Sequence, residues 1–435
     1  MLPPSRRSFL ALTAVTTTLA AVAACSGSST SGSDTPGSDT SDAAGDEGSV
    51  TAQATARDDS ADLVIWADEP KARSVEDAAR AWGEEQGITV AVQVIADDQQ
   101  DTFITANQAG NGPDIMLGAH DWIGNLVQNG TITPVTISEE DRTNISEVAL
   151  SAVTYDAQTY AVPYAVETLG LFVNKSLTDV VAPGSLEELV EAGRAADTGT
   201  ILSLPVGEEG NAYHFQPIYT AGGGYLFGRN EDGSYNPDDL GVGKEGSLQA
   251  AERISELGSD GVLKKSVTDD NYISLFTEGK APYLVSGPWA LADIKAAGID
   301  YQLSEIPGFT DVPDSQALPF AGVNCFYVAS KGRNRAFAES LVTHVATSSS
   351  FVEKMFALNE LPPVHKDLAD RLSADNPDMV SFSELAAQTD PMPSIPEMSA
   401  VWMPLAAAQA NIVAGADPES TMTSAGDQIA SSLAG

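Results

Sequence analysis

The chain has 435 residues and a formal net charge of −39 at pH 7, with 61 Asp and Glu against 22 Lys and Arg. A protein this acidic is repelled by nucleic acids and by anionic lipid surfaces, which argues against both as partners. Residues 62–435 are enough for two domains of ordinary size.

The first 24 residues have the features of a signal peptide. Arg6 and Arg7 precede an apolar stretch, roughly 9–24, that is too short and too rich in Thr and Ala for a comfortable transmembrane span. The pattern SRRSFL also suggests the twin-arginine route, although the export route stays open. Small residues before Cys25 resemble a bacterial lipobox, which implies a lipidated Cys25 anchored to the cell membrane. The alternative is an ordinary signal peptide followed by an incidental cysteine.

The segment 25–61 is predicted to be a disordered tether behind the lipid. It consists mainly of Ser, Gly, Thr, Ala and Asp, so it buries too little apolar surface to offset its ordering entropy. A coil of this kind reaches roughly 30–35 Å. A lipidated Cys25 cannot form a disulfide, so we expect Cys325 to be a small buried apolar residue and packing to stabilise the fold.

The body of the chain opens with a pattern typical of α/β proteins. A strand is expected at 62–67, a helix at 74–87 and a strand at 88–95. Ser74 with Asp77 resembles a capping box, and Gly87 suits the position after the helix. Strand, helix and strand with short joins predict a βαβ unit in a parallel sheet.

Strands and helices continue to alternate further along the chain. Pro288 is placed at the first helical position after an apolar strand, next to Trp289. The expected elements are a strand within 110–119, strands within 160–174, a helix at 185–196, strand then helix across 281–294, and mainly helix at 336–358.

We find no pattern that supports catalysis, and no cofactor or metal is expected. None of the four histidines, His120, His214, His344 and His365, has a partner at zinc-ligand spacing, and nucleophile-elbow and nucleotide-binding motifs are missing. The pairs Glu187-Glu188 and Glu208-Glu209 could suggest a glycosidase, but most acids in so acidic a chain are solvated. A hairpin turn is favoured over a calcium loop at 230–233.

Aromatic residues at expected loop positions favour a sugar ligand. Aromatic rings lie flat against the C–H face of a pyranose, and carboxylates, amides and Lys or Arg bind its hydroxyl rim. The candidates are Trp66, Trp122, Trp289 and Trp402. For each of them, packing in the core is the alternative.

Seven motifs, in order, resemble those of the maltose/maltodextrin-binding proteins of bacterial ABC importers. The resemblance covers nearly everything from Asp62 to the C-terminus. The motifs are LVIWADEPK (63–71), EEQGITV (84–90), GNGPDIMLGAHDW (110–122), YAVPYAVETLGLFVNKSL (160–177), YTAGGGYLF (219–227), VSGPWALADI (285–294) and MPSIPEMSAVW (392–402).

This resemblance implies an α/β fold of two lobes, each a mainly parallel sheet flanked by helices, that close on a ligand about hinge segments. Lobe I would comprise 62–168 and 314–361, and lobe II 169–313 and 362–435. The chain would cross between them near 165–170, 308–315 and 361–364. The implied partners are an oligosaccharide of the malto-oligosaccharide class and the importer's permease subunits, and we expect a monomer that is not an enzyme.

The resemblance also implies a set of ligand-binding residues. Asp101, Asp121 and Glu167 would accept hydrogen bonds from sugar hydroxyls, and Lys71 would donate to them. Tyr213 would stack or donate, and Trp289 and Trp402 would provide aromatic faces. The predicted site is therefore Lys71, Asp101, Asp121, Trp122, Glu167, Tyr213, Trp289 and Trp402.

Two departures leave the preferred sugar open. The family often has Trp where Gly118 stands and Arg where Trp122 stands, so the aromatic ring is shifted along the chain. Its Glu-Pro-Tyr is Asn211-Ala212-Tyr213 here, with the acid lost. Longer chains or trehalose-like disaccharides are alternatives, as are a secreted glycoside hydrolase and a binding protein for a peptide or polyamine.

Overall fold

The computed structural model describes residues 56–96, 98–231 and 233–434. The predicted signal peptide, Cys25 and most of the predicted tether therefore lie outside the described residues. The described fold belongs to one unit, Val50–Gly435. None of its described helices is long and apolar enough to cross a bilayer.

The first sheet has five strands in the order β2-β1-β3-β13-β6. Strand β1 pairs in parallel with β2 and with β3, which confirms the predicted βαβ unit. Strand β13 runs antiparallel to β3 and β6. The strands are β1 (Leu63–Ala67), β2 (Val90–Val94), β3 (Ile115–Ala119), β6 (Val162–Glu167) and β13 (Gly322–Val328).

The second sheet has four strands in the order β12-β7-β11-β8, and β11 is parallel to β8 but antiparallel to β7. Its residues alternate between two cores, with Leu171 and Val173 in one and Phe172 in the other. The strands are β7 (Gly170–Asn174), β8 (Leu202–Ser203), β11 (Tyr283–Ser286) and β12 (Tyr301–Ser304). Short hairpins pair β4 (Thr154–Tyr155) with β5 (Gln158–Thr159) and β9 (Phe227–Arg229) with β10 (Tyr235–Leu240).

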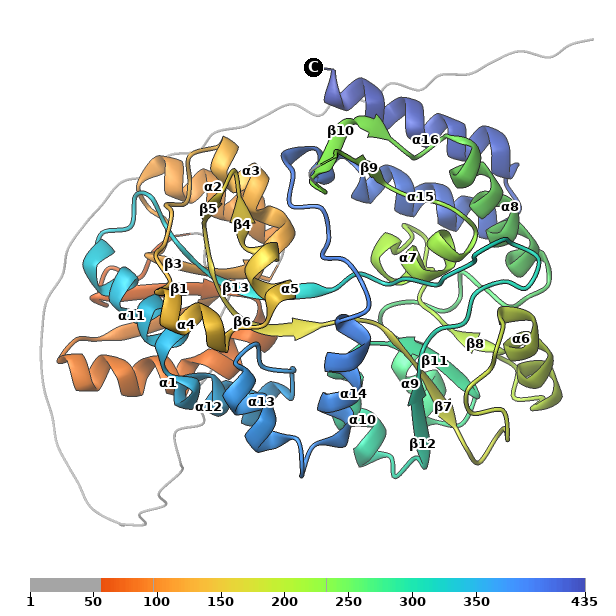
Figure 1. The fold of residues 1–435 in the computed structure, drawn as a ribbon, viewed down its shortest axis with the longest axis horizontal. Helices are drawn as coiled ribbons and strands as arrows, with labels where there is room; N and C mark the ends of the chain where they lie inside the picture. The colour runs from red at the N-terminus through yellow and green to blue at the C-terminus, as the bar shows by residue number, and fades with distance from the viewer. Residues whose placement is uncertain (1–55, 97, 232, 435) are drawn as a thin grey trace, which may run out of the picture. The chain divides into compact units, whose positions relative to one another are not determined.

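Helices flank both sheets (Figure 1). Beside the first sheet are α1 (Glu69–Gln86), α2 (Gln99–Ala109), α3 (Ile123–Gln128), α4 (Glu139–Asn144), α5 (Glu147–Ala152), α11 (Arg335–Thr347), α12 (Ser349–Asn359) and α13 (Lys366–Leu372). One core of the second sheet includes α6 (Leu186–Ala195), α7 (Ala212–Ala221), α8 (Glu245–Ser259), α15 (Trp402–Val413) and α16 (Pro418–Leu433). The other includes α9 (Tyr272–Thr277), α10 (Leu291–Ala296) and α14 (Pro377–Ala386). Single 3₁₀ turns are η1 (His120–Trp122), η2 (Pro288–Ala290) and η3 (Pro396–Ala400).

The two sheets with their helices are the two lobes of the α/β class predicted from sequence, called here the first and second lobe. Each sheet is mainly parallel, as predicted, and has one strand that runs against the others, β13 in the first sheet and β7 in the second. The reason is that β7 and β13 arrive from the opposite lobe rather than by a helical crossover within their own sheet, so they are free to pair antiparallel.

The chain passes between the lobes at three places. Thr168 and Leu169 separate β6 from β7, and residues 305–321 separate β12 from β13. The Thr168 hydroxyl donates to the Phe320 carbonyl over 2.9 Å and so ties these two passages together. The third passage follows Leu368 of α13, which still packs in the first core, and precedes Phe382 of α14, which packs beside Phe172. The exact lobe boundaries given above stay predictions.

Helix α1 begins earlier than the sequence predicts. Its N-cap is Asp68, whose carboxylate accepts a hydrogen bond from the Lys71 backbone N–H over 2.8 Å, and Pro70 lies in the first turn. Ser74, predicted to be the cap, is buried within the helix and its hydroxyl donates to the Lys71 carbonyl. Gly87 ends the helix as predicted, with φ of 72°.

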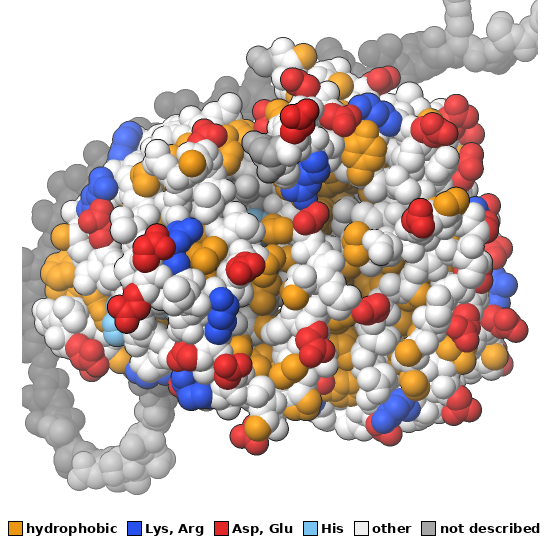
Figure 2. All heavy atoms as spheres, in the orientation of Figure 1, with side chains coloured by type: hydrophobic (Ala, Val, Ile, Leu, Met, Phe, Trp, Pro, Cys, Tyr) orange, Lys and Arg blue, Asp and Glu red, His pale blue; other side chains and the backbone are white. Residues whose placement is uncertain are grey.

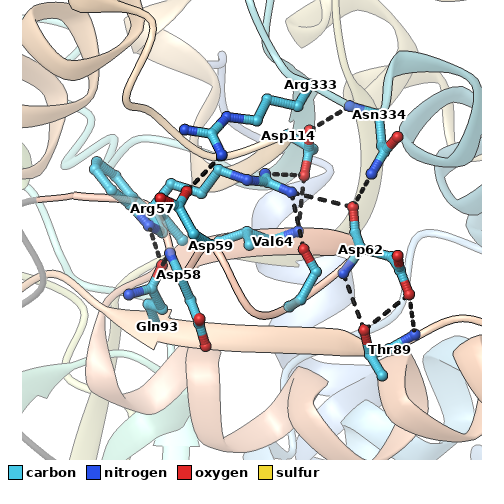
Figure 3. Close-up of polar contacts among 12 residues, drawn as sticks. Arg57, Asp58, Asp59, Asp62, Val64, Thr89, Gln93, Asp114, Arg333 and Asn334 are labelled. Carbon is cyan, nitrogen blue, oxygen red and sulfur yellow. Dashed lines mark hydrogen bonds and ion pairs between the residues drawn. The ribbon is translucent and has the colours of Figure 1, made fainter.

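The first described residues are clasped onto the amino end of the first sheet (Figure 3). The Arg57 side chain forms a buried ion pair with Asp114, which also accepts hydrogen bonds from the backbone N–H groups of Val64 and Asn334, each over 2.8 Å. Asp59 pairs with Arg333. The prediction of a tether reaching Ala61 is therefore wrong for residues 57–61, because the buried Arg57 guanidinium and the pair of Asp59 with Arg333 hold this polar segment to the fold.

Candidate functional site

The candidate site lies where strands end and short turns begin. Turn η1 follows β3 directly and holds Asp121 and Trp122, while η2 follows β11 and holds Trp289. Asp68 and Lys71 come immediately after β1. Ligands of α/β folds bind beyond the carboxyl ends of strands, so this edge of each sheet is the expected place for a site.

Trp289 is held at its turn by two contacts. Its indole folds back over Gly287, where any side chain would overlap the ring. Its Nε1–H donates to the Tyr272 hydroxyl over 2.7 Å. The ring is partly buried, so its setting differs from that of Trp66, which is fully enclosed in the first core and donates to Gln93.

Four aromatic rings form a contiguous group in the second lobe and the neighbouring chain passage. Ring centroids are 6.4 Å apart for Tyr213 and Trp289, 6.2 Å for Tyr213 and Phe320, and 5.9 Å for Phe320 and Trp402. We call these four residues the aromatic group. The structure thus brings together three predicted residues, and it adds Phe320.

Asp121 of the first lobe meets this group. Burial raises the pKa of Asp121 to about 7, and its own backbone N–H, followed by the nearby Trp402 side chain, partly opposes that rise. The Asp121 Oδ1 atom is buried and has no partner among the described residues. A carboxylate from one lobe and an indole from the other therefore lie near each other.

Glu167 lies at the end of β6, at the first passage between the lobes. Its carboxylate accepts a hydrogen bond from the Asn324 side chain over 3.1 Å. Burial raises the pKa of Glu167, and the charge of Lys71 opposes this rise. Lys71 itself pairs with Asp68.

Tyr213 connects the acidic residues with the aromatic group. Burial, followed by the charges of Glu167 and Asp121, raises the pKa of the Tyr213 phenol well above its usual value. Its hydroxyl has no hydrogen-bond partner in the described part of the chain.

Two predicted residues lie apart from this arrangement. Asp101 is exposed in the first turn of α2, and no contact within the described ranges joins it to the other site residues. Trp122 is next to Asp121 but packs against the first core. Its ring occupies the space where a side chain on Gly118 would lie, so the absence of a side chain at 118 is what accommodates Trp122.

Sequence reasoning considered His214 and His120 only as zinc ligands and gave neither a place in the site, although His120 lies within the motif 110–122. The His214 ring packs edge-on against Tyr272, with centroids 5.3 Å apart, and is 6.1 Å from Trp289. His120 accepts a hydrogen bond from the Val323 N–H at Nδ1, so its Nε2–H donates to the Met392 carbonyl over 3.1 Å. Burial lowers the His120 pKa to about 4, and the neutral ring holds the chain passages in place.

Taken together, these groups suit an uncharged ligand that carries many hydroxyls. Partly buried rings offer flat apolar faces, and the unpartnered carboxyl and phenol oxygens offer hydrogen bonds at their edge.

The sequence itself matches known proteins. Residues 77–381 match the family model described as bacterial extracellular solute-binding protein. The chain belongs to this family. The predicted resemblance is thereby confirmed at the level of the family, whose members are binding proteins rather than enzymes.

Relatives of this solute-binding protein are named for the sugars they bind. It is 29% identical over 374 residues to the galactooligosaccharide-binding protein of Bacillus subtilis (strain 168), covering 84% of this chain and 88% of the relative. Identity to the maltodextrin-binding protein MdxE of the same organism is 29% over 381 residues, with the same two shares. Identity to the maltooligosaccharide ABC transporter solute-binding lipoprotein of Streptococcus pneumoniae (strain ATCC BAA-255 / R6) is 24% over 370 residues, 82% of this chain and 86% of the relative.

Proposed function

We propose that this protein captures an oligosaccharide between its two lobes and delivers it to the permease subunits of an ABC importer. The observation that carries the proposal is the unpartnered, buried Asp121 carboxylate oxygen of the first lobe, which lies near Trp402 in the aromatic group of the second. This arrangement lets a ligand interact with both lobes at once, which favours the closed arrangement.

The proposed ligand is an oligosaccharide of the malto-oligosaccharide or galactooligosaccharide class. Relatives named for each class support this choice. Trp289, Trp402 and Tyr213 would stack on the sugar rings, while Asp121, Glu167 and Lys71 would bind hydroxyls. Trp122 and Asp101 would reach only the outer units of a longer chain, since neither lies with the aromatic group.

Titration calorimetry with maltose, maltotriose, galactotriose and trehalose tests this proposal. We expect saturable binding of at least one oligosaccharide and none of a matched peptide or polyamine. Chromatography of the recovered sugar should show it unchanged, because shorter products would instead support a glycoside hydrolase. The absence of binding to every sugar would overturn the proposal.

We also propose that Cys25 carries a lipid that holds the protein to the cell membrane, as the name of the pneumococcal relative suggests. Expression of the Cys25→Ala variant tests this. The wild-type protein should fractionate with membranes and the variant should be released, while equal partitioning of the two would contradict a lipid anchor.

A further inference from the structure

His214 is the one described histidine that has neither exposure nor a hydrogen bond at its ring. Only 6% of the residue is exposed, and neither Nδ1 nor Nε2 has a partner among the described residues. By contrast, the buried rings of His120 and His365 each bond a backbone carbonyl, at Met392 and Ala346. Its own backbone is fixed, because the His214 N–H donates to the Asn211 side chain at the start of α7.

The surroundings of the imidazole place it at the candidate site rather than deep in the second core. Its neighbours are the rings of Tyr213, Tyr272 and Trp289, at centroid distances of 5.7, 5.3 and 6.1 Å. Two of these three residues belong to the aromatic group. The other unpartnered buried atoms near this group are the Tyr213 hydroxyl and the Asp121 Oδ1.

Leaving such polar atoms unpaired is costly. Each buried donor or acceptor without a partner costs about 1–3 kcal/mol, so native proteins keep few of them. Phenylalanine would fill the same space between three aromatic rings without this cost. The persistence of an imidazole there points to a partner that arrives from outside the chain.

We propose that His214 is a specificity-determining residue whose imidazole hydrogen-bonds a hydroxyl of the bound oligosaccharide. The inference rests on the proposed function and identifies a polar contact within the same site. A neutral imidazole has one N–H donor and one acceptor nitrogen, which complements a hydroxyl that can both accept and donate. Burial lowers the His214 pKa to about 3, so the ring stays neutral at physiological pH.

The test compares His214→Phe with the matched variant His365→Phe, which removes the nitrogens of another buried histidine, one that precedes α13 and bonds Ala346 of α11. Calorimetry uses whichever of maltotriose and galactotriose the wild-type protein binds more tightly. His214→Phe should weaken binding about 10-fold, the size of one lost hydrogen bond and its unpaired partner. His365→Phe should leave affinity unchanged. Without sugar, His214→Phe should melt no lower than wild type.

Singly deoxygenated versions of the same trisaccharide separate a direct contact from a packing effect. Removal of the hydroxyl that His214 binds should weaken wild-type binding but leave His214→Phe binding unaltered, since the two changes remove one interaction. Equal wild-type and His214→Phe affinity, or additive losses for every deoxygenated sugar, would overturn the inference while leaving the proposed function intact. If the wild-type protein binds neither trisaccharide, this inference fails, and the proposed function fails with it only if maltose and trehalose are not bound either.

Discussion

The ionisation of Asp121 should be measurable in solution. Its pKa of about 7 in the folded protein lies well above the value of ~3.9 expected in an unfolded chain. The folded state therefore holds a proton that the unfolded state has released, and stability without sugar should fall as pH rises from about 4 to about 7. Asp121→Asn should remove this component. Thermal melts of both proteins across that range measure the difference, and parallel curves would show that Asp121 is not shifted.

Sugar affinity should depend on pH in the opposite direction. If ionised Asp121 accepts hydrogen bonds from sugar hydroxyls, binding should strengthen as pH rises through about 7, because charged acceptors form stronger bonds. The Asp121→Asn variant should bind more weakly and lose the pH dependence. Calorimetry from about pH 6 to about pH 8 checks this, and a wild-type affinity that is flat with pH would contradict it.

The indoles of Trp289 and Trp402 should each contribute to sugar affinity. Truncation to Ala removes a buried aromatic contact and should cost about 1–3 kcal/mol of binding free energy. Trp289→Phe is the milder companion, because it keeps a ring but loses the hydrogen bond to the Tyr272 hydroxyl. Calorimetry on all three variants checks whether both alanine variants lose affinity and whether Trp289→Phe loses less than Trp289→Ala. Unchanged affinity with a lower melting temperature would assign these indoles to the core.

Some residues of the site could be predicted from the sequence, and others could not. Asp121, Tyr213, Trp289 and Trp402 stand at or near recognisable motifs and are brought together in the structure. His214 and Phe320 are surrounded by sequence typical of a core helix or strand, and only the tertiary contacts show them beside the site. Whether any of them binds sugar stays a prediction.

At the scale of elements, the packing of Trp122 where strand β3 passes into turn η1 can be tested directly. A methyl group on Gly118 would overlap the Trp122 ring, so Gly118→Ala should displace the indole and destabilise the protein by about 1–3 kcal/mol. Gly184→Ala is a matched control, since its nearest neighbour would be the Glu188 carboxylate at 3.5 Å. Denaturant unfolding measures both variants, and equal stabilities would show that Trp122 moves aside freely.

Elements with a strong periodic pattern of apolar residues were predicted well, but the residues at which they begin and end were predicted less accurately. The βαβ unit and the 185–196 helix match β1, α1, β2 and α6, because alternation and helical spacing record which face is buried. The start of α1 was missed because Asp68, in a motif interpreted through ligand binding, also caps the helix. The one antiparallel strand in each sheet could not be deduced, since its direction follows from passages between lobes that local patterns do not encode.

For the whole molecule, acidic side chains are spread over the face shown in Figure 2, with Lys and Arg among them. This distribution agrees with the expectation that most of the acidic side chains are solvated. The ion pairs on the surface involve exposed groups and contribute little each. The buried pair of Arg57 and Asp114 is different, since breaking it leaves one buried charge unpaired.

The ion pairs of Arg57 with Asp114 and of Asp59 with Arg333, called here the clasp, should therefore determine at which residue the folded unit begins. A chain that starts at Ala56 should be as stable as the full mature chain, whereas one that starts at Asp62 should lose about 3–5 kcal/mol. Asp114→Asn in the longer chain should reproduce much of that loss. Urea unfolding compares the three proteins. Equal stability of the chains starting at Ala56 and Asp62 would show that the clasp is dispensable.

The clasp involves only the amino-terminal edge of the first lobe, at the end of the sheet opposite the strand ends that hold Asp68 and Asp121. A force applied to the chain ahead of Arg57 would thus act on the first lobe and not on the second. The proposed closure of the second lobe on a sugar would then do no work against the membrane attachment, so anchoring and ligand capture would be mechanically independent.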